Sequence, residues 1–173
     1  MLINLPIGSI VFIDSNIFIY VALEDIRYKD ICKEFLRKVN DGKYNAVISA
    51  VVISEVFHVV LLAELAELFN ISQKEVVRLI KSNPIFIVAN APTAMSSAKK
   101  PWQAVEDIKN INNISILEIG YYEVDYASPI SKQYNLLMND SLHLAVMKKH
   151  GIQDIATNDS DFDRVDNIQV WKP

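Results

Sequence analysis

Short apolar runs and helically spaced apolar positions follow one another along the chain. Residues 8–14 (GSIVFID) form a β-branched apolar run after a glycine, which predicts a buried strand that ends at Asp14. Residues 28–42 instead place Ile31, Phe35 and Val39 at helical spacing before a closing glycine. The N-terminal part of the chain therefore predicts a βα unit.

The same alternation continues toward the C-terminus. Residues 44–50 predict a strand that leads directly into a helix over 51–69, and a second helix over 72–82 opens with a capping-box pattern. Residues 84–100 combine an apolar run with a loop rich in Ser, Ala, Pro and Lys. The remaining predicted elements are a helix from about Pro101, a strand at 114–119, helices at 128–137 and 139–151, a strand ending near Thr157 and a last strand at 168–171. This order predicts an α/β sandwich around a mostly parallel sheet.

Composition narrows the class of protein. Apolar residues make up 51% of the 173 residues and charged residues 22%, which is typical of one folded domain. Cys32 is the single cysteine, which excludes an internal disulfide and favours a reducing compartment, with the thiol in the core. The most apolar segment contains Glu55, His58 and Glu64, which argues against a membrane helix, and the start lacks the pattern of a secretory signal. We therefore expect a soluble cytoplasmic protein.

The charge balance bears on nucleic-acid binding. A net charge of −4 argues against a protein that binds nucleic acid through a lysine-rich surface. It leaves a nuclease open, because divalent cations held by clustered carboxylates invert the local charge that a phosphate meets. The acidic residues are therefore the first candidates for chemistry.

Four acidic residues stand where open parallel sheets bind ligands, outside the C-terminal ends of the strands. Asp14 ends the first strand, and Asp159 follows a late strand. Glu55 lies in the opening turns of the helix after the second strand, and Asp140 opens the helix that leads into the late strand. The predicted topology therefore brings these four carboxylates to one edge of the sheet.

Clustered carboxylates repel one another and lose hydration, so cations or protons must neutralise them. Mg²⁺ and Mn²⁺ prefer oxygen ligands, and paired ions can activate a water and stabilise the leaving oxygen in phosphodiester hydrolysis. Each residue alone has a simpler interpretation: Asp14 or Asp140 as a turn former or helix cap, and Glu55 as an exposed helix residue. The coincidence of all four favours a metal-dependent phosphoester hydrolase.

Residues 12–18 (FIDSNIF), 49–56 (SAVVISEV) and 139–162 (NDSLHLAVMKKHGIQDIATNDSDF) form a recognisable set, of which the last is the most specific. They resemble the PIN-domain nucleases, and most closely the VapC-type toxin ribonucleases. The residues that carry the resemblance are Asp14, Asn16, Glu55, Asp140, Thr157, Asp159 and Asp161.

The resemblance implies a three-layer α/β/α PIN-like fold and a ribonuclease that depends on Mg²⁺ or Mn²⁺. The catalytic acids that it implies are Asp14, Glu55, Asp140 and Asp159. Of these, the three aspartates would be metal ligands. The outer residues that would hydrogen-bond these acids are Asn16, Thr157 and Asp161. Asp161 is equally consistent with an N-cap of the segment that follows it.

The middle of the chain departs from the family pattern. Residues 61–112 contain no motif that maps onto it, whereas small PIN toxins reach their third acid sooner. We therefore expect a single PIN-like domain over 1–173 with a helical extension at about 61–112. A toxin would bind RNA as substrate and an antitoxin protein as partner. The apolar helix over 51–69 suits an antitoxin helix, a second copy in a homodimer, or simply the core.

Other candidates have two interpretations each. His58 and His143 each lie three residues after an acid, and packed or half-exposed helix positions are favoured over a place in the site. Lys99 and Lys100 beside Trp102 could bind single-stranded RNA by phosphate contact and stacking, but a solvated loop with the tryptophan in the core is the simpler prediction. A second candidate phosphate contact consists of Arg27, Lys29 and Lys33.

Two other functions stay open beside an RNA-cleaving enzyme. A metal-dependent nuclease acting on DNA, such as a flap-type enzyme, would use the same acids. A non-catalytic interaction module could bind a partner's arginine in an acidic pocket. Such a module would be free to lose some of the four acids, so their joint presence favours the enzyme.

Overall fold

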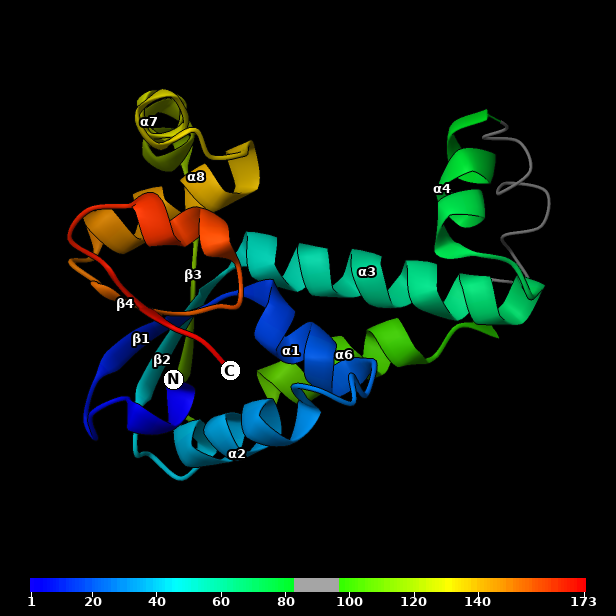
Figure 1. The fold of residues 1–173 in the computed structure, drawn as a ribbon, viewed down its shortest axis with the longest axis horizontal. Coiled ribbons are helices and arrows are strands. Elements are labelled where there is room, and N and C mark those ends of the chain that lie inside the picture. Colours follow the sequence, from blue (N-terminus) through cyan, green and yellow to red (C-terminus); the bar gives the residue numbers. More distant parts are fainter. Residues whose placement is uncertain (83–96) are drawn as a thin grey trace.

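The computed structural model describes residues 1–82 and 97–173. In these ranges strands alternate with helices, as the sequence predicts (Figure 1). The strands are β1 (Ile10–Ile13), β2 (Asn45–Ser49), β3 (Ile114–Leu117), β4 (Asp154–Ala156) and β5 (Gln169–Trp171). The helices are α1 (Ser15–Ala22), α2 (Lys29–Asn40), α3 (Ala50–Phe69), α4 (Gln73–Ser82), α6 (Lys100–Lys109), α7 (Tyr121–Tyr134) and α8 (Met138–Lys149), with the short 3-10 helices η1 (Leu2–Asn4) and η2 (Ser160–Arg164).

The strands form one sheet in the order β3-β2-β1-β4-β5, and each neighbouring pair is parallel. The central strand β1 is apolar, and Val11, Phe12 and Ile13 are fully buried. Parallel neighbours need crossover connections, which the helices supply. Strand order reverses at β1, between β2 and β4, which is the place where such sheets bind ligands. The prediction of a mostly parallel sheet is confirmed.

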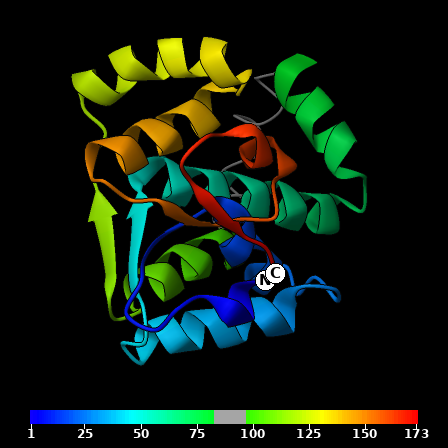
Figure 2. The same cartoon turned by 60° about the vertical axis from the view of Figure 1, so that its left-hand side comes forward.

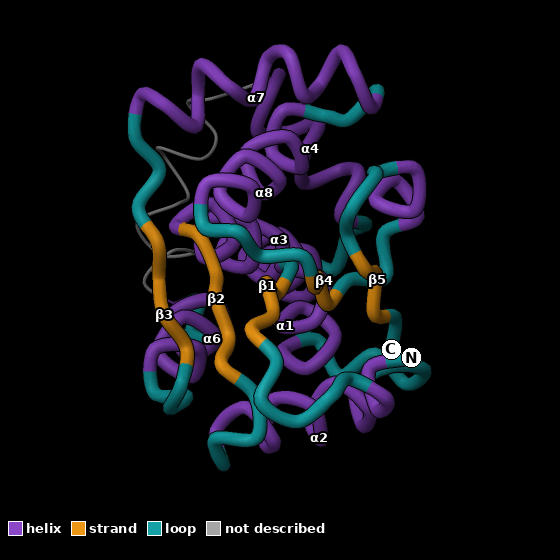
Figure 3. Tube along the Cα trace, turned by 90° about the vertical axis from the view of Figure 1, so that its left-hand side faces the viewer, coloured by secondary structure: helices purple, strands orange, loops and turns teal. Residues whose placement is uncertain are grey.

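Helices lie on both sides of the sheet. In Figures 1 and 2, α7 and α8 pack together on one side, α1, α2 and α6 lie together on the other, and α3 runs between the two groups. The far half of α3 extends beyond the sheet toward α4. Figure 3 shows the strands side by side between the helices, with the two termini adjacent, where Leu2 N–H donates to the Lys172 carbonyl at 2.7 Å. The predicted three-layer α/β/α fold is confirmed.

The core follows the predicted pattern of apolar positions. Cys32 is fully buried in the main core, as predicted, and burial raises the pKa of its thiol to about 12. A smaller apolar cluster of Leu65, Ala66 and Val76 joins α3 to α4. Across the described ranges, no helix has both the length and the apolar character needed to cross a membrane.

One helix begins well before its predicted start. The helix predicted at 128–137 spans Tyr121–Tyr134. Gly120 precedes it in an extended conformation, and its N–H donates to the Glu123 carboxylate at 2.8 Å, as in a capping box. Pro129, the second residue of the predicted helix, lies inside the observed one. The predicted start was wrong because the capping contact between Gly120 and Glu123 sets the N-terminus one to two turns earlier.

A buried carboxylate of α3 holds the N-terminus of α6, the helix predicted from about Pro101. The Glu64 side chain accepts hydrogen bonds from the N–H groups of Lys99 and Lys100 at 3.0 Å, and the residue is 8% exposed. The first N–H groups of a helix lack intrahelical acceptors, so Glu64 caps α6 from another helix. The predicted apolar run before α6, and most of the predicted loop, lie outside the described residues.

Removing this cap tests its contribution to stability. We expect Glu64→Ala to lower the free energy of unfolding by about 1–2 kcal/mol, because the N–H groups of Lys99 and Lys100 lose their acceptor. Urea denaturation followed by circular dichroism measures the change. Glu67→Ala is the matched control, since it removes only an exposed ion pair with Lys100, worth at most about 1 kcal/mol. Equal losses in the two variants would contradict the capping role.

Candidate active site

Asp14 follows β1 directly and is the N-cap of α1. Its Oδ1 accepts from Ser15 N–H at 2.6 Å, and its Oδ2 accepts from Thr157 Oγ1 at 2.6 Å and from Asn16 Nδ2 at 2.5 Å. The residue is only 6% exposed. Burial raises the pKa of the Asp14 carboxyl, although the charge of His143 and the Thr157 hydroxyl act in the opposite direction. A buried acid is thus surrounded by hydrogen-bond donors.

Asn16 and Thr157 connect Asp14 to the loop after β4. The Asn16 amide also donates to Thr157 Oγ1 at 2.8 Å, and Thr157 Oγ1 accepts from Asp159 N–H at 2.9 Å. Asn158 N–H completes the link by donating to Asn16 Oδ1 at 3.2 Å. The structure therefore places two of the three predicted outer residues, Asn16 and Thr157, against Asp14, while their part in a reaction stays a prediction.

Glu55 lies in the second turn of α3 and meets two side chains of α8. Its Oε1 accepts from Asn139 Nδ2 at 2.7 Å, and its Oε2 lies 3.2 Å from His143 Nε2. Burial alone would raise the pKa of Glu55. The hydrogen bond and charge of His143, with hydrogen bonds from Asn139 and Ser15, outweigh burial and lower the pKa. Glu55 is therefore an ionised acceptor at neutral pH.

Asp140 lies in the first turn of α8, and Asp159 is the N-cap of η2. One carboxylate oxygen from each of these residues and from Asp161 lies within 4.8 Å of the other two. Burial, followed by the negative charge of Asp159, raises the pKa of Asp140 to about 6. The charge of His143 acts in the opposite direction, and Asp14 and Glu55 add smaller increases. The folded protein therefore places other negative charges close to Asp140.

The four predicted acids open into one pocket of about 460 Å³. The residues that line it are Asp14, Ser15, Asn16, Glu55, Leu137, Met138, Asn139, Asp140 and Asp159. Three of these residues are aspartates, whose carboxylate oxygens are the ligands that hard divalent cations prefer. The pKa values of Asp14 and Asp140 are raised, and a bound cation would offset the negative charge of the pocket. The structure thus brings together all four acids that the sequence singled out.

Two predicted capping positions differ in the structure. Asp159, not Asp161, is the N-cap of η2, and its Oδ1 accepts from the Asp161 N–H at 2.8 Å. The Asp161 carboxylate pairs instead with Arg164 at 2.9 Å. The N-cap interpretation of Asp161 is therefore wrong, because the short helix starts two residues earlier, at Ser160. Asp140, expected at or beside the N-cap of α8, lies in its first turn after an N-cap at Leu137.

Sequence reasoning left His143 and Asn139 out of the site. His143 is fully buried, as a packed helix position would be, yet its ring nitrogen and a carboxylate oxygen each from Asp14 and Glu55 lie within 4.8 Å of one another. The available signal was spacing, because side chains three and four residues apart share one side of a helix and Asp140 already marks that side. His58, by contrast, is exposed.

The basic loop and its tryptophan differ from the prediction. Trp102, expected in the core, is 53% exposed and packs edge-on against Phe57 with 4.6 Å between ring centroids. The ammonium of Lys100 pairs with Glu67, and the N–H groups of Lys99 and Lys100 bind the α3 carboxylate described above. The predicted burial was wrong because α6 buries Pro101, Ala104 and Ile108 instead.

The second basic group is dispersed. Arg27 pairs with Asp25 at 2.9 Å, which offsets the charge that a phosphate would meet. Lys33 lines a separate pocket between α1, α2 and α6. These contacts give no support to a joint phosphate site of Arg27, Lys29 and Lys33.

The fold and this acidic pocket define a class of protein. Residues 11–168 match the model of the PIN domain, and the chain belongs to the PIN domain family. It is 27% identical over 164 residues to Ribonuclease VapC6 of Methanocaldococcus jannaschii, a match that covers 95% of this chain and 97% of that protein. The predicted resemblance to VapC-type proteins is thereby confirmed.

Solved structures share the fold. VapC20 of Mycobacterium tuberculosis, a Sarcin-Ricin loop cleaving toxin, aligns with a TM-score of 0.59 and 14% identity over 91% of this chain and 96% of that chain. VapBC2 of Rickettsia felis, bound to a DNA fragment from its promoter, aligns with a TM-score of 0.52 and 16% identity over 95% and 98%. At these identities the likeness shows the fold alone.

Asp140 predicts how stability changes with pH in the absence of divalent ions. Its pKa is about 6 in the folded protein against an ordinary 3.8, so the folded state binds this proton more tightly. The resulting stability is complete below about pH 4 and is lost as the pH rises through about 6. In chelator we therefore expect Asp140→Asn to melt at a higher temperature than wild type at neutral pH, with the gap closing toward pH 4.

Thermal unfolding across this pH range measures the effect. Asp166→Asn, an exposed change outside the pocket, is the control and should follow wild type. A gap between Asp140→Asn and wild type that does not depend on pH would contradict the raised pKa.

Proposed function

We propose that the protein is a metal-dependent endoribonuclease that hydrolyses RNA phosphodiester bonds. The observation that carries the proposal is the convergence of Asp14, Glu55, Asp140 and Asp159 in one pocket at the strand ends of a parallel sheet. Membership of the PIN domain family and similarity to a protein named as a ribonuclease support RNA as the substrate.

Asp14, Asp140 and Asp159 are the residues that would hold Mg²⁺ or Mn²⁺. Their donors are carboxylate oxygens, which hard divalent cations prefer, and the raised pKa values of Asp14 and Asp140 mark negative charge that a cation would offset. When bound, such an ion acts as a Lewis acid that acidifies a water and offsets charge on the phosphate.

The chain's own side chains hold the acids in place. Asn16 and Thr157 restrain the rotamer of Asp14 through hydrogen bonds to Oδ2. The Asp161 N–H restrains Asp159 in the same way. Glu55 is ionised at the wall of the pocket, where it either completes the metal shell or orients the attacking water.

Cleavage of a mixed RNA substrate with Mn²⁺, with Mg²⁺ and with chelator tests the proposal. We expect wild type to cut only with metal. Asp140→Asn should keep the fold and lose more than about 100-fold in rate, because even the partners of metal ligands contribute about 10–100-fold. Asp166→Asn is the matched control and should cut like wild type. Full activity of Asp140→Asn would remove this acid from the mechanism.

Two further arms address the alternatives. A DNA oligonucleotide of the same sequence tests the DNA nuclease, and faster cutting of DNA than of RNA would favour it. A chain that cuts neither RNA nor DNA would favour the non-catalytic module. Calorimetry with Mn²⁺ then shows whether its acids bind metal. A chain that neither cuts nor binds metal would overturn the convergence argument.

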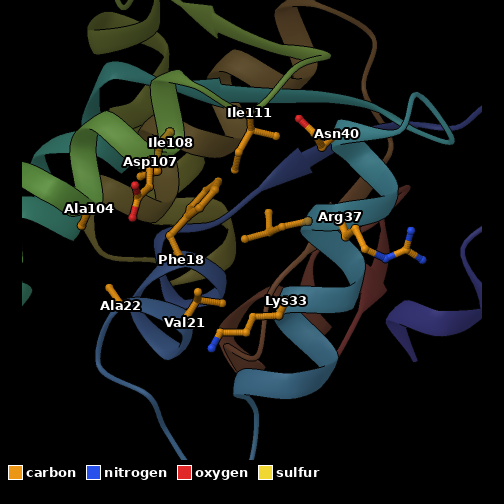
Figure 4. Close-up of a pocket in the computed structure, with 11 residues that line it drawn as sticks. Phe18, Val21, Ala22, Lys33, Arg37, Asn40, Ala104, Asp107, Ile108 and Ile111 are labelled. Carbon is orange, nitrogen blue, oxygen red and sulfur yellow. The ribbon is translucent and has the colours of Figure 1, made fainter.

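We propose an antitoxin protein as the partner, on the pocket between α1, α2 and α6. The pocket has a volume of about 310 Å³, with Phe18, Val21 and Ile108 in its apolar lining and Lys33 and Asp107 beside them (Figure 4). An apolar groove with charged residues at its edge suits an amphipathic segment. The shared fold with VapBC2 supports a partner of this kind. The α3 helix, expected as a possible partner surface, buries Val52, Val56 and Val60 in the main core, while Leu68 near its end is exposed.

Filling this pocket tests the partner site. Ala22 lines the pocket, so Ala22→Arg places a long charged side chain in it without touching the acids. We expect binding of the protein encoded beside this gene to weaken by at least about tenfold, with RNA cleavage unchanged. Asp166→Arg, an exposed change outside both pockets, is the control. Unchanged binding by Ala22→Arg would place the partner elsewhere.

The homodimer and the domain organisation belong to the same proposal. Tyr121, Tyr122 and Val124 are exposed on α7 and form an apolar side that a second copy would cover. Light scattering of the purified chain tests the dimer. The family match over 11–168 supports one domain, and in the described part of the expected extension at about 61–112 the helix α4 packs on α3.

A further inference from the structure

Two side chains of α8 hold Glu55 from one direction. Asn139 Nδ2 donates to Oε1 at 2.7 Å, and His143 Nε2 lies 3.2 Å from Oε2. Asn139 and His143 are four residues apart, so both project from the same side of α8 toward α3. Each oxygen of the Glu55 carboxylate therefore has one partner that comes from α8.

The partners of His143 place the hydrogen on its ring. An ionised carboxylate only accepts hydrogen bonds, so His143 Nε2 carries the hydrogen that is donated to Glu55. The other ring nitrogen, Nδ1, lies 3.3 Å from the Ser49 hydroxyl, which is fully buried at the N-cap of α3. A hydroxyl can donate to a bare Nδ1 or accept from a protonated one. Both ring nitrogens thus have a hydrogen-bond partner, and the partner of Nε2 is Glu55.

His143 itself reaches neither substrate nor metal. Its side chain has no exposed surface, and its ring packs on Phe12 of β1 with 5.2 Å between the centroids. A metal would need Nε2 as a bare acceptor, which the contact with Glu55 excludes. Ser49 is equally buried, so the group is not a nucleophilic serine triad. The hydrogen bond to Glu55 is therefore the contact through which His143 influences chemistry in the pocket.

We propose that His143, together with Asn139, is a positioning residue that keeps Glu55 as a fixed acceptor for the attacking water rather than a metal ligand. The inference rests on the proposed nuclease function. About a quarter of the Glu55 side chain (23%) stays exposed, and this part lines the pocket with Asp14 and Asp140. Metal binding is then left to the three aspartates, and Glu55 faces the reacting phosphate from a fixed rotamer.

Substitutions at His143 and Asn139 test the role. His143→Phe removes both ring nitrogens and keeps an aromatic ring against Phe12, whereas His143→Gln keeps an N–H donor for Glu55. We expect kcat with Mn²⁺ to fall by about 10–100-fold in His143→Phe and to recover in His143→Gln. Asn139 is exposed, so Asn139→Ala removes the second donor without disturbing the core, and it should lower kcat as well. KM for RNA and the Kd for Mn²⁺ alone should stay at wild-type values.

A double-mutant cycle separates a role through Glu55 from an independent one. If His143 acts through Glu55, adding His143→Phe to Glu55→Gln causes no further loss of kcat. A further loss would overturn the proposal. A parallel loss of Mn²⁺ affinity would also overturn it, because the pair would then support the metal shell. A lower melting temperature with unchanged kcat would reduce His143 to a structural residue.

A spectroscopic measurement keeps this inference distinguishable from the nuclease proposal. Imidazole ¹⁵N NMR of the metal-free protein should show one ring that carries hydrogen on Nε2 and is absent in His143→Gln. The signal should shift in Glu55→Gln. If the His143 signal does not respond to Glu55→Gln, the inference is contradicted, whether or not the protein cleaves RNA. A wild-type chain that cuts no RNA would overturn the nuclease function, and the NMR signal would still decide whether His143 holds Glu55.

Discussion

The negative charge gathered at the strand ends of the sheet must be compensated, and the surrounding structure supplies hydrogen-bond donors that do so. Asp14 is almost fully buried, and burial makes its ionised form unfavourable unless donors surround it. The Ser15 N–H, the Thr157 hydroxyl and the Asn16 amide supply these donors. They come from the start of α1 and the loop after β4, so the same hydrogen bonds join neighbouring elements at the centre of the sheet and preserve an acidic pocket. A cation in that pocket would supply the remaining compensation.

The long helix α3 joins this pocket to the rest of the molecule through two carboxylates. Near its start, Glu55 accepts from Asn139 and His143 of α8, and further along, Glu64 accepts from the N–H groups at the start of α6. The physics is the same in both places, because a carboxylate satisfies donors presented by another helix. The results differ in exposure: Glu64 is buried and structural, whereas Glu55 keeps a face toward the pocket and is available for chemistry.

The short helix α1 links the two pockets. Asp14 caps its N-terminus at the acidic pocket, while Phe18 and Val21, one and two turns later, line the apolar pocket beside α2 and α6. A helix that starts at an acid and continues with apolar residues thus serves an electrostatic site at one end and a packing surface along its side. Because α1 borders both pockets, a partner segment bound in the apolar pocket would lie close to the acids without occupying their pocket.

The sequence by itself determined the order of strands and helices, the parallel sheet and the gathering of the four acids, because local periodicity sets each element and parallel strands end at one edge. Only the tertiary structure decided which further side chains join those acids. His143 lies 88 residues from Glu55, and Lys99 lies 35 residues from Glu64, so these contacts depend on how helices rotate and pack against one another. The same holds for Trp102, which stays half exposed because α6 buries Pro101, Ala104 and Ile108 instead. Local patterns fix a residue's place within its helix, whereas the packing of distant helices fixes what that residue meets.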